Sequence, residues 1–193
     1  MLFKAMSEDD GTSKNMELRI LPIADGDEVK LSQQMGSPER EHKSYLRLQE
    51  EGKATYLVAW EATTPVGHLL IRWGGSLEVP RIVDRMPNAA KFGNYPCFDR
   101  IEVRRDRRGH GIGTSLIKCA EDVVRERGYE YAMIEVDIVN IRARALYERL
   151  SYIESGLGEY TTSGTYSDDD GHLIDWINGP QVMLIKRILA TRN

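Results

Sequence analysis

The chain has 193 residues, of which 41% are hydrophobic and 29% are charged. These values exclude wholesale disorder and predict one domain with a core large enough to fold unaided. The net charge of −4 argues against a general nucleic-acid binder, and no apolar run approaches the ~20 residues of a membrane span. Two cysteines without a metal or disulfide motif favour a reduced, cytoplasmic setting without a metal site.

Polar, turn-rich residues open the chain and predict a flexible tail over residues 1–15, followed by a domain over residues 16–193. Hydrophobic periodicity then predicts a first strand, two helices, and two strands that pair as an antiparallel hairpin. The expected ranges are a strand at 16–21, helices at 25–35 and 37–50, and strands at 54–60 and 66–73. The connection over residues 74–96 is long for a compact domain, so we expect it to line a substrate cleft.

A strand that runs into a cationic, glycine-rich turn dominates the second half of the chain. The turn carries four arginines and three glycines within ten residues, and a helix with a 3.6-residue apolar stripe follows it. Glycines let backbone amides face a ligand closely, and a helix N-terminus adds about half a positive charge, so a phosphate cradle is predicted. The expected ranges are strands at 97–103 and 131–137, helices at 112–127 and 141–150, and closing strands at 152–160 and 181–188.

The strand–helix–strand unit predicts a parallel pair between residues 97–103 and 131–137. The predicted fold class is therefore α/β, with one mixed, mostly antiparallel central sheet flanked by helices. Residues 161–180 are expected to connect the closing strands through a solvated turn at 167–171. Their aspartates indicate either an acidic rim that attracts a cationic amine or a solubilising hairpin tip.

Three motifs follow one another in this half of the chain. Residues Ile101-x-Val103 lead into Arg108-Gly-His-Gly-Ile-Gly113, and further on Ile134-x-Val136-x-x-x-Asn140 precedes Ala145-Leu-Tyr-Glu-Arg-Leu150. This set resembles the GCN5-related N-acetyltransferases, the GNAT superfamily, whose acetyl-coenzyme A motif is Arg/Gln-x-x-Gly-x-Gly/Ala. One departure is Ser151, which stands where that family usually has a glycine after the helix.

The resemblance implies an enzyme that moves an acetyl group from acetyl-coenzyme A to a primary amine by direct attack in a ternary complex. Asn140 is an implied coenzyme ligand, although an asparagine before a helix is also a routine N-cap. The arginines at 104, 105 and 107 are expected either to reach the outer phosphate or to form a solvated turn. The full implied coenzyme set is Ile101, Val103, Arg108, Gly109, His110, Gly111, Ile112, Gly113, Thr114 and Asn140.

Acetyl transfer needs an acid for the leaving thiolate and a donor for the developing oxyanion. The resemblance implies Tyr147 as the general acid, with a core-facing aromatic as the alternative. A backbone N–H near Val103 is the expected oxyanion donor. Neither Cys97 nor Cys119 is needed as a nucleophile, and Cys119 is expected to pack inside its helix.

The transfer also needs a base for the ammonium of the acceptor, and several carboxylates compete for that role. Glu102 and Asp99 are the first candidates, and their odd spacing predicts opposite faces of the strand. Glu135 and Asp137 share a face of the next strand and are the reserve candidates. His68 is expected to be a satisfied core or edge histidine rather than a cleft residue.

The motifs leave the acceptor open between a small-molecule amine, cationic in one reading, and a peptide, with neither nucleic acid nor membrane as a partner. A homodimer is compatible with the sequence. A coenzyme-binding sensor or partner-binding module without turnover is the alternative function, and the intact Tyr147 argues against it. A dinucleotide-binding protein is the weaker rival, because Thr114 stands where the last glycine of Gly-x-Gly-x-x-Gly is required.

Overall fold

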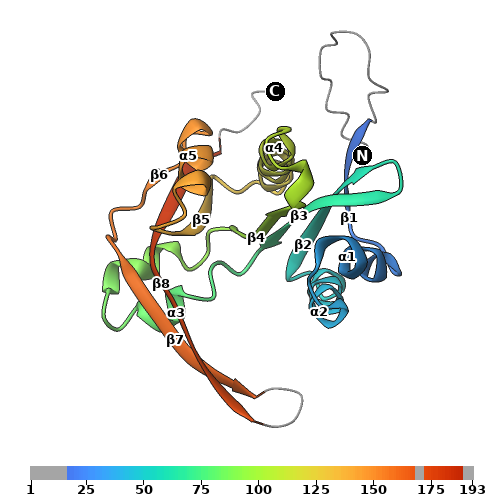
Figure 1. Ribbon diagram of the computed structural model, residues 1–193. Helices are drawn as coiled ribbons and strands as arrows, with labels where there is room; N and C mark the ends of the chain where they lie inside the picture. The colour runs from blue at the N-terminus through green and yellow to red at the C-terminus, as the bar shows by residue number, and fades with distance from the viewer. Residues whose placement is uncertain (1–16, 168–171, 189–193) are drawn as a thin grey trace.

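A single mixed sheet organises the chain, which a computed structural model describes over residues 17–167 and 172–188 (Figure 1). The strands are β1 Leu18–Pro22, β2 Ala54–Glu61, β3 Thr64–Arg72, β4 Cys97–Val103, β5 Tyr131–Asp137, β6 Ile153–Glu154, β7 Tyr160–Ser167 and β8 Leu173–Arg187. Their order is β1-β2-β3-β4-β5-β8-β6, and β7 pairs with β8 outside this path. Every pair is antiparallel except β4 with β5, which confirms the predicted fold class. The tail predicted at 1–15 lies outside the described residues.

Helices cover both faces of the sheet (Figure 1). On one face, α1 (Asp27–Met35) and α2 (Glu39–Glu50) bury Leu31 and Tyr45 against β2 and β3. On the other face lie α4 (Ile112–Glu126) and α5 (Ile141–Arg149), and the predicted apolar stripe of α4 packs into the main core. None of the helices in the described part of the chain has both the length and the hydropathy of a membrane span.

The parallel contact between β4 and β5 is short. Only two residue pairs form it, Cys97 with Met133 and Phe98 with Ile134. Beyond Phe98 the two strands separate, while β5 remains paired with β8 along its whole length. One edge of β4 is therefore unpaired from residue 99 onward, and we call this place the seam.

A β-bulge interrupts β4 next to the seam. In the ladder with β3, Leu70 lies opposite Asp99 but His68 lies opposite Glu102, so two residues of β4 oppose Leu69. Arg100 occupies the bulge with φ of 51°. Because Leu70 and His68 are two residues apart on β3, they point to the same face of the sheet, toward α2. Their partners Asp99 and Glu102 therefore lie on that face as well. The predicted opposite faces are wrong, because the spacing rule assumes a regular strand.

The C-terminal strands also differ from the prediction. The expected strand at 152–160 is only the two-residue β6, whereas most of the expected connection at 161–180 forms β7 and the first half of β8. These segments project from the sheet as an arm, defined here as residues 160–167 and 173–180 (Figure 1). The two strands of the arm are held together by backbone hydrogen bonds to each other. One face of the arm is open to solvent, since Leu173 and Ile177 are each 76% exposed. Part of the predicted turn, residues 168–171, lies outside the described residues.

Residues 74–96 contain two short helices, α3 (Val79–Ile82) and the 3-10 helix η1 (Pro87–Phe92). Their buried side chains form a third core cluster with Met133 of β5 and Tyr160 of β7. The arm is fastened to this connection: Arg85 donates to the carbonyl of Thr161 (3.0 Å), and the Arg81 guanidinium lies 5.1 Å from the Trp176 ring centre. The connection and the arm thus form one wall beside the seam.

Candidate active site

A groove of about 570 Å³ follows the free edge of β4 between the first turn of α4 and the side of α5. It brings together every residue of the predicted coenzyme set except His110, which is exposed and faces the carbonyls of Arg107 and Arg108 (3.2 Å each). The nine that line the groove are Ile101, Val103, Arg108, Gly109, Gly111, Ile112, Gly113, Thr114 and Asn140. The groove therefore has the shape expected for a long, flexible ligand laid along a strand edge.

The start of α4 provides a site for an anion at one end of this groove. Gly111 is the N-cap in the left-handed region (φ 79°), and within residues 17–167 and 172–188 no side chain caps the first amides of the helix. Gly109 is also left-handed (φ 88°), as a turn this tight requires. Since the first four N–H groups of a helix lack intrahelical partners, the amides here are available to phosphate oxygens.

Most arginines of the cationic turn are held by the protein itself. Arg107 pairs with Glu61 of β2, and Arg104 donates to Asp106 (2.7 and 3.0 Å). Arg108 lines the groove while its Nε donates to the carbonyl of Val103 (3.0 Å). Of the expected outer-phosphate arginines, two are thus committed to neighbouring carboxylates.

Two further arginines, Arg142 and Arg149 of α5, line the groove and were not predicted as site residues. They are seven residues apart, which places them on one face of a helix two turns from each other. That spacing, next to Leu146 on the same wall of the groove, is the signal that could have identified them. They add positive charge on the side opposite the glycine turn.

Tyr147 lies where the groove meets a smaller cavity of about 200 Å³ in the seam, and it lines both. The residue is only 7% exposed, and burial raises the pKa of its phenol to about 12. The hydroxyl is therefore protonated at neutral pH and able to donate. Asn140 lines the same two cavities and caps α5, its Oδ1 accepting from the amide of Ala143 (3.1 Å).

The left-handed turn after α5 forms without glycine, with Ser151 at φ 67°.

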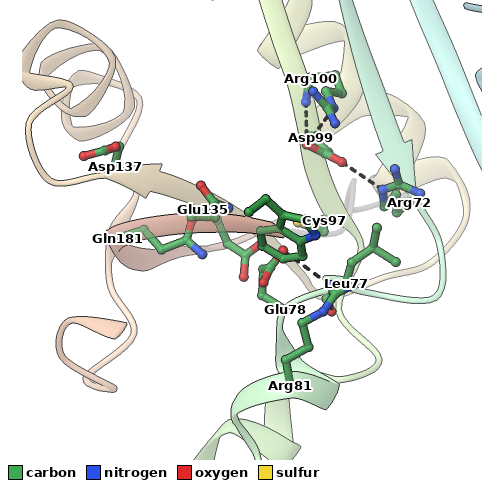
Figure 2. Close-up of a pocket in the computed structure, with 12 residues that line it drawn as sticks. Arg72, Leu77, Glu78, Arg81, Cys97, Asp99, Arg100, Glu135, Asp137 and Gln181 are labelled. Carbon is green, nitrogen blue, oxygen red and sulfur yellow. Dashed lines mark hydrogen bonds and ion pairs between the residues drawn. The ribbon is translucent and has the colours of Figure 1, made fainter. Parts of the chain in front are cut away.

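A third cavity, of about 590 Å³, lies on the other side of the seam (Figure 2). The connection at 74–96 contributes Leu77, Glu78 and Arg81 to its lining. It therefore lines a cavity, and the prediction that this cavity binds the substrate stays a prediction. The arm contributes Trp176, whose indole lies against Gly164 so closely that a Cβ there would come within 2.8 Å of it. This cavity shares residues of β4 and β5 with the small cavity of Tyr147, so the two adjoin.

Glu135 of β5 is the carboxylate in this cavity whose pKa is shifted furthest. It lines both the large and the small cavity, and its Oε1 accepts from Ser76 Oγ (2.6 Å) and from the Tyr160 hydroxyl (2.7 Å). Burial raises the pKa of Glu135 to about 7, although both hydrogen bonds act in the opposite direction. A carboxylate with a pKa near the working pH has the property expected of a general base.

The two carboxylates ranked first from the sequence have different surroundings. Asp99 lines the large cavity but is engaged by Arg72 Nε (2.9 Å) and by the amide of Arg100 (2.7 Å) (Figure 2). Glu102 lines the coenzyme groove and a further cavity beside α2, and not the large cavity. The imidazole of His68, whose Nε2 lies 3.6 Å from Glu102 Oε2, holds the pKa of that carboxyl below its usual value.

Of the aspartates expected to form an acidic rim, Asp175 does not line this cavity, and its carboxylate accepts from Thr165 Oγ1 (2.6 Å) on the exposed arm. Residues 168–170 lie outside the described residues. Among the described residues, the acidity of the cavity comes from Glu78 and from Asp99, Glu135 and Asp137 on β4 and β5, against Arg72, Arg81 and Arg100. The sequence did not show this acidic cluster, because its carboxylates come from separate elements and are not close together along the chain.

Comparisons with known proteins agree with this geometry. The model of the acetyltransferase (GNAT) family matches residues 27–152. The chain is 39% identical over 73 residues to a streptothricin acetyltransferase of Streptomyces lavendulae, and 32% identical over 66 residues to N-alpha-acetyltransferase 30 of Schizosaccharomyces pombe. These segments cover 38% and 34% of this chain, and 39% and 44% of the two relatives.

A solved structure supports the same fold over nearly the whole chain. The ribosomal-protein-S18-alanine N-acetyltransferase of Escherichia coli superposes with a TM-score of 0.59 at 16% identity, covering 91% of this chain and 96% of its own. The family match spans more than half of the residues, and the chain belongs to the acetyltransferase (GNAT) family.

Proposed function

We propose that this protein transfers an acetyl group from acetyl-coenzyme A to a primary amine by direct attack in a ternary complex. The observation that carries the proposal is the pairing, across one seam, of Glu135, with a pKa of about 7, and Tyr147, with a pKa of about 12. Glu135, half ionised near neutral pH, lines the large cavity, and the protonated phenol of Tyr147 lines the groove. These are the two proton-transfer partners that amine acylation requires.

The groove fits the coenzyme that family membership implies. The uncapped amides at Gly111 and after it suit the pyrophosphate, and Arg142 and Arg149 suit the outer phosphate. The unpaired edge of β4 offers backbone groups to the amides of the pantetheine arm. Bound in this way, the coenzyme supplies an activated thioester beside Tyr147.

The protein's own groups then divide the proton transfers. Glu135 removes a proton from the acceptor ammonium so that the nitrogen lone pair can attack. A backbone N–H of β4 near Val103 donates to the thioester oxygen as negative charge develops there. As the C–N bond forms and the C–S bond breaks, Tyr147 protonates the departing sulfur. The second proton of the attacking nitrogen then restores the phenol of Tyr147. Asp99 is the second choice for the base, because its carboxylate is already bonded to Arg72.

For the acceptor we propose a small amine with cationic character. The arm and the connection at 74–96 line one side of the large cavity, which offers four carboxylates against three arginines. The streptothricin acetyltransferase among the relatives gives this choice weight. We also propose a reducing, cytoplasmic setting, because Cys97 and Cys119 are both free and buried.

The decisive experiment is a thiol-release screen with acetyl-coenzyme A against several classes of amine. Small polyamines, streptothricin-type antibiotics and short peptides with a free N-terminus cover the acceptors under consideration. Release above background with small cationic amines supports the proposal, and release with peptides alone corrects the acceptor class. Coenzyme binding without release from any amine would favour a sensor or partner-binding module instead.

Tyr147→Phe is expected to lower kcat about 100-fold with the acetyl-coenzyme A Kd unchanged within about twofold. The change removes only the hydroxyl that donates to the thiolate, while the ring keeps its place in the core. Tyr152→Phe is the matched control: its ring lies 6.3 Å from that of Tyr147, and it lines neither of the two cavities that Tyr147 lines. Stopped-flow thiol release and calorimetry give the two constants, and wild-type turnover in Tyr147→Phe would remove this residue from the acid role.

A further inference from the structure

The bulge of β4 is held from the neighbouring strand by a buried imidazole. We propose that His68 is a positioning residue for acetyl transfer, which fixes the backbone of the bulge through its hydrogen bond to the carbonyl of Arg100. The inference rests on the proposed function and adds to it a residue that touches neither substrate. Its ring lies behind β4, on the α2 side, whereas the coenzyme groove lies along the free edge.

The first step is that the bulge is strained. Arg100 has φ of 51°, a region that residues with a Cβ rarely occupy, and the chain has no glycine there. Such conformations persist only where the surroundings fix them. Two bonds do so here: the amide of Arg100 donates to Asp99 Oδ1 (2.7 Å), and its carbonyl accepts from His68 Nδ1 (2.9 Å).

The second step is that this carbonyl fixes the proton on the ring. A carbonyl oxygen can only accept, so Nδ1 of His68 carries a hydrogen. The other ring nitrogen, Nε2, lies 3.6 Å from Glu102 Oε2, which is beyond hydrogen-bond distance. The bond to the carbonyl of Arg100 is therefore the direct link from His68 to the bulge, and Glu102 is a longer-range neighbour of the ring.

The third step is that the ring cannot easily move. His68 is 3% exposed and packs edge-on against His42 (ring centres 5.6 Å apart) and Tyr56 (5.4 Å). His42 is itself fixed by a hydrogen bond to the Tyr56 hydroxyl (2.8 Å). A rigid donor at a fixed depth sets the position of the carbonyl that it contacts.

The consequence lies in the backbone of residues 100–103. The bulge puts Asp99 and Glu102 on the α2 face and leaves Ile101 and Val103 beside the groove, where the oxyanion donor is proposed. Without the bond from His68, the carbonyl of Arg100 is free to turn, and the next amides lose their direction. The phosphate cradle belongs to α4 and does not depend on this bond, so turnover is expected to suffer while coenzyme binding does not.

Three substitutions separate the two contacts of the ring. His68→Asn keeps an N–H donor near the Nδ1 position, His68→Gln places its amide near Nε2, and His68→Leu removes both. We expect kcat to fall about 100-fold in the Gln and Leu variants and less than about fivefold in the Asn variant, as displacement of reacting groups by ~1 Å would cause. The coenzyme Kd should stay within about twofold of wild type.

Retained kcat in the Gln variant with loss in the Asn variant overturns the inference, because the contact with Glu102 would then be the one that matters. Equal and wild-type kcat in all three variants overturns it as well. Nitrogen-15 NMR of the histidine rings at pH 8 tests the contact without activity: a His68 ring protonated at Nδ1 supports it, and one protonated at Nε2 overturns it. A wild-type chain that releases no thiol with any amine contradicts the proposed function, and the ring tautomer still decides whether His68 holds the bulge.

Discussion

Glu135→Gln is expected to reduce kcat/KM by about 100-fold to 10,000-fold, the range that a general base contributes. In the wild type, kcat/KM should rise with pH through about 7 as the carboxyl of Glu135 loses its proton. The Gln variant keeps an oxygen that accepts from Ser76 and Tyr160, so the cavity should keep its shape. A pH series of kcat/KM for both proteins checks the expectation, and an unchanged limb near pH 7 in the variant would contradict it.

The same substitution should stabilise the protein in alkaline solution. The folded-state pKa of about 7 is raised above the ordinary value of 4.5, so the stability contributed by Glu135 is fully present below about pH 4.5 and lost as pH rises through about 7. A shift of this size corresponds to ~3 kcal/mol, which the neutral amide does not lose. Thermal or urea unfolding at pH 8 should show Glu135→Gln as more stable than wild type, and at pH 4 the difference should vanish.

Asp137→Asn is the matched control, since Asp137 lies on the same face of β5 and lines the same large cavity. Its Oδ1 accepts from the amide of Val139 (3.0 Å), and an asparagine oxygen can keep that bond. The control should retain most of the turnover. Loss of turnover in Asp137→Asn with wild-type turnover in Glu135→Gln would assign the base to Asp137 instead.

Gly111→Asp is expected to weaken acetyl-coenzyme A binding about 100-fold, because a carboxylate among the first amides of α4 repels phosphate oxygens at short range. The fold should survive with some loss of stability, since open space surrounds the position of the added Cβ but the φ of 79° strains any residue other than glycine. Isothermal calorimetry measures the affinity, and urea unfolding checks the stability. Unchanged affinity would contradict the cradle at the start of α4.

Two controls separate charge from backbone strain in that experiment. Gly111→Asn adds a side chain of the same shape without the charge, and it should cost much less affinity than Gly111→Asp. Gly128→Asp places the same residue at the other end of α4, where glycine has the same φ of 79° and equally open space. This second control should lose stability to a similar extent and keep the affinity of the wild type.

Much of the fold could be predicted because its elements carry strong periodic patterns. The stripe of α4, the hairpin of β2 and β3, and the parallel pair all follow from apolar spacing and connection length. The arm could not be predicted in this way, because burial is confined to its base at Tyr160 and Thr162, while Leu173 and Ile177 are exposed and give no apolar alternation. The bulge escaped as well, since no glycine marks it: Arg100 takes the left-handed conformation with support from another strand.

The site divides along similar lines. The glycine turn before α4 and Tyr147 of α5 could be proposed from local motifs, because each motif lies within one helix and the turn before it. The rank of Glu135 among the carboxylates could not, since its pKa depends on burial by the connection and the arm, with Ser76 and Tyr160 lying 59 and 25 residues away in the sequence. Local sequence shows which groups are available, and the tertiary structure decides which of them is perturbed.

The two-pair contact between β4 and β5 makes the sheet a jointed structure rather than a continuous plate. Across the joint the backbone ladder is nearly absent, and the core around α4 holds the two halves together. Under the proposed function, the coenzyme in the seam would bond to the free edge of β4, and its binding would add to the stability of the protein. By mass action, a ligand at 100 times its Kd adds about 2.7 kcal/mol to the free energy of unfolding. If the coenzyme binds as proposed, the resistance of this chain to unfolding and proteolysis should rise with the concentration of its acyl donor.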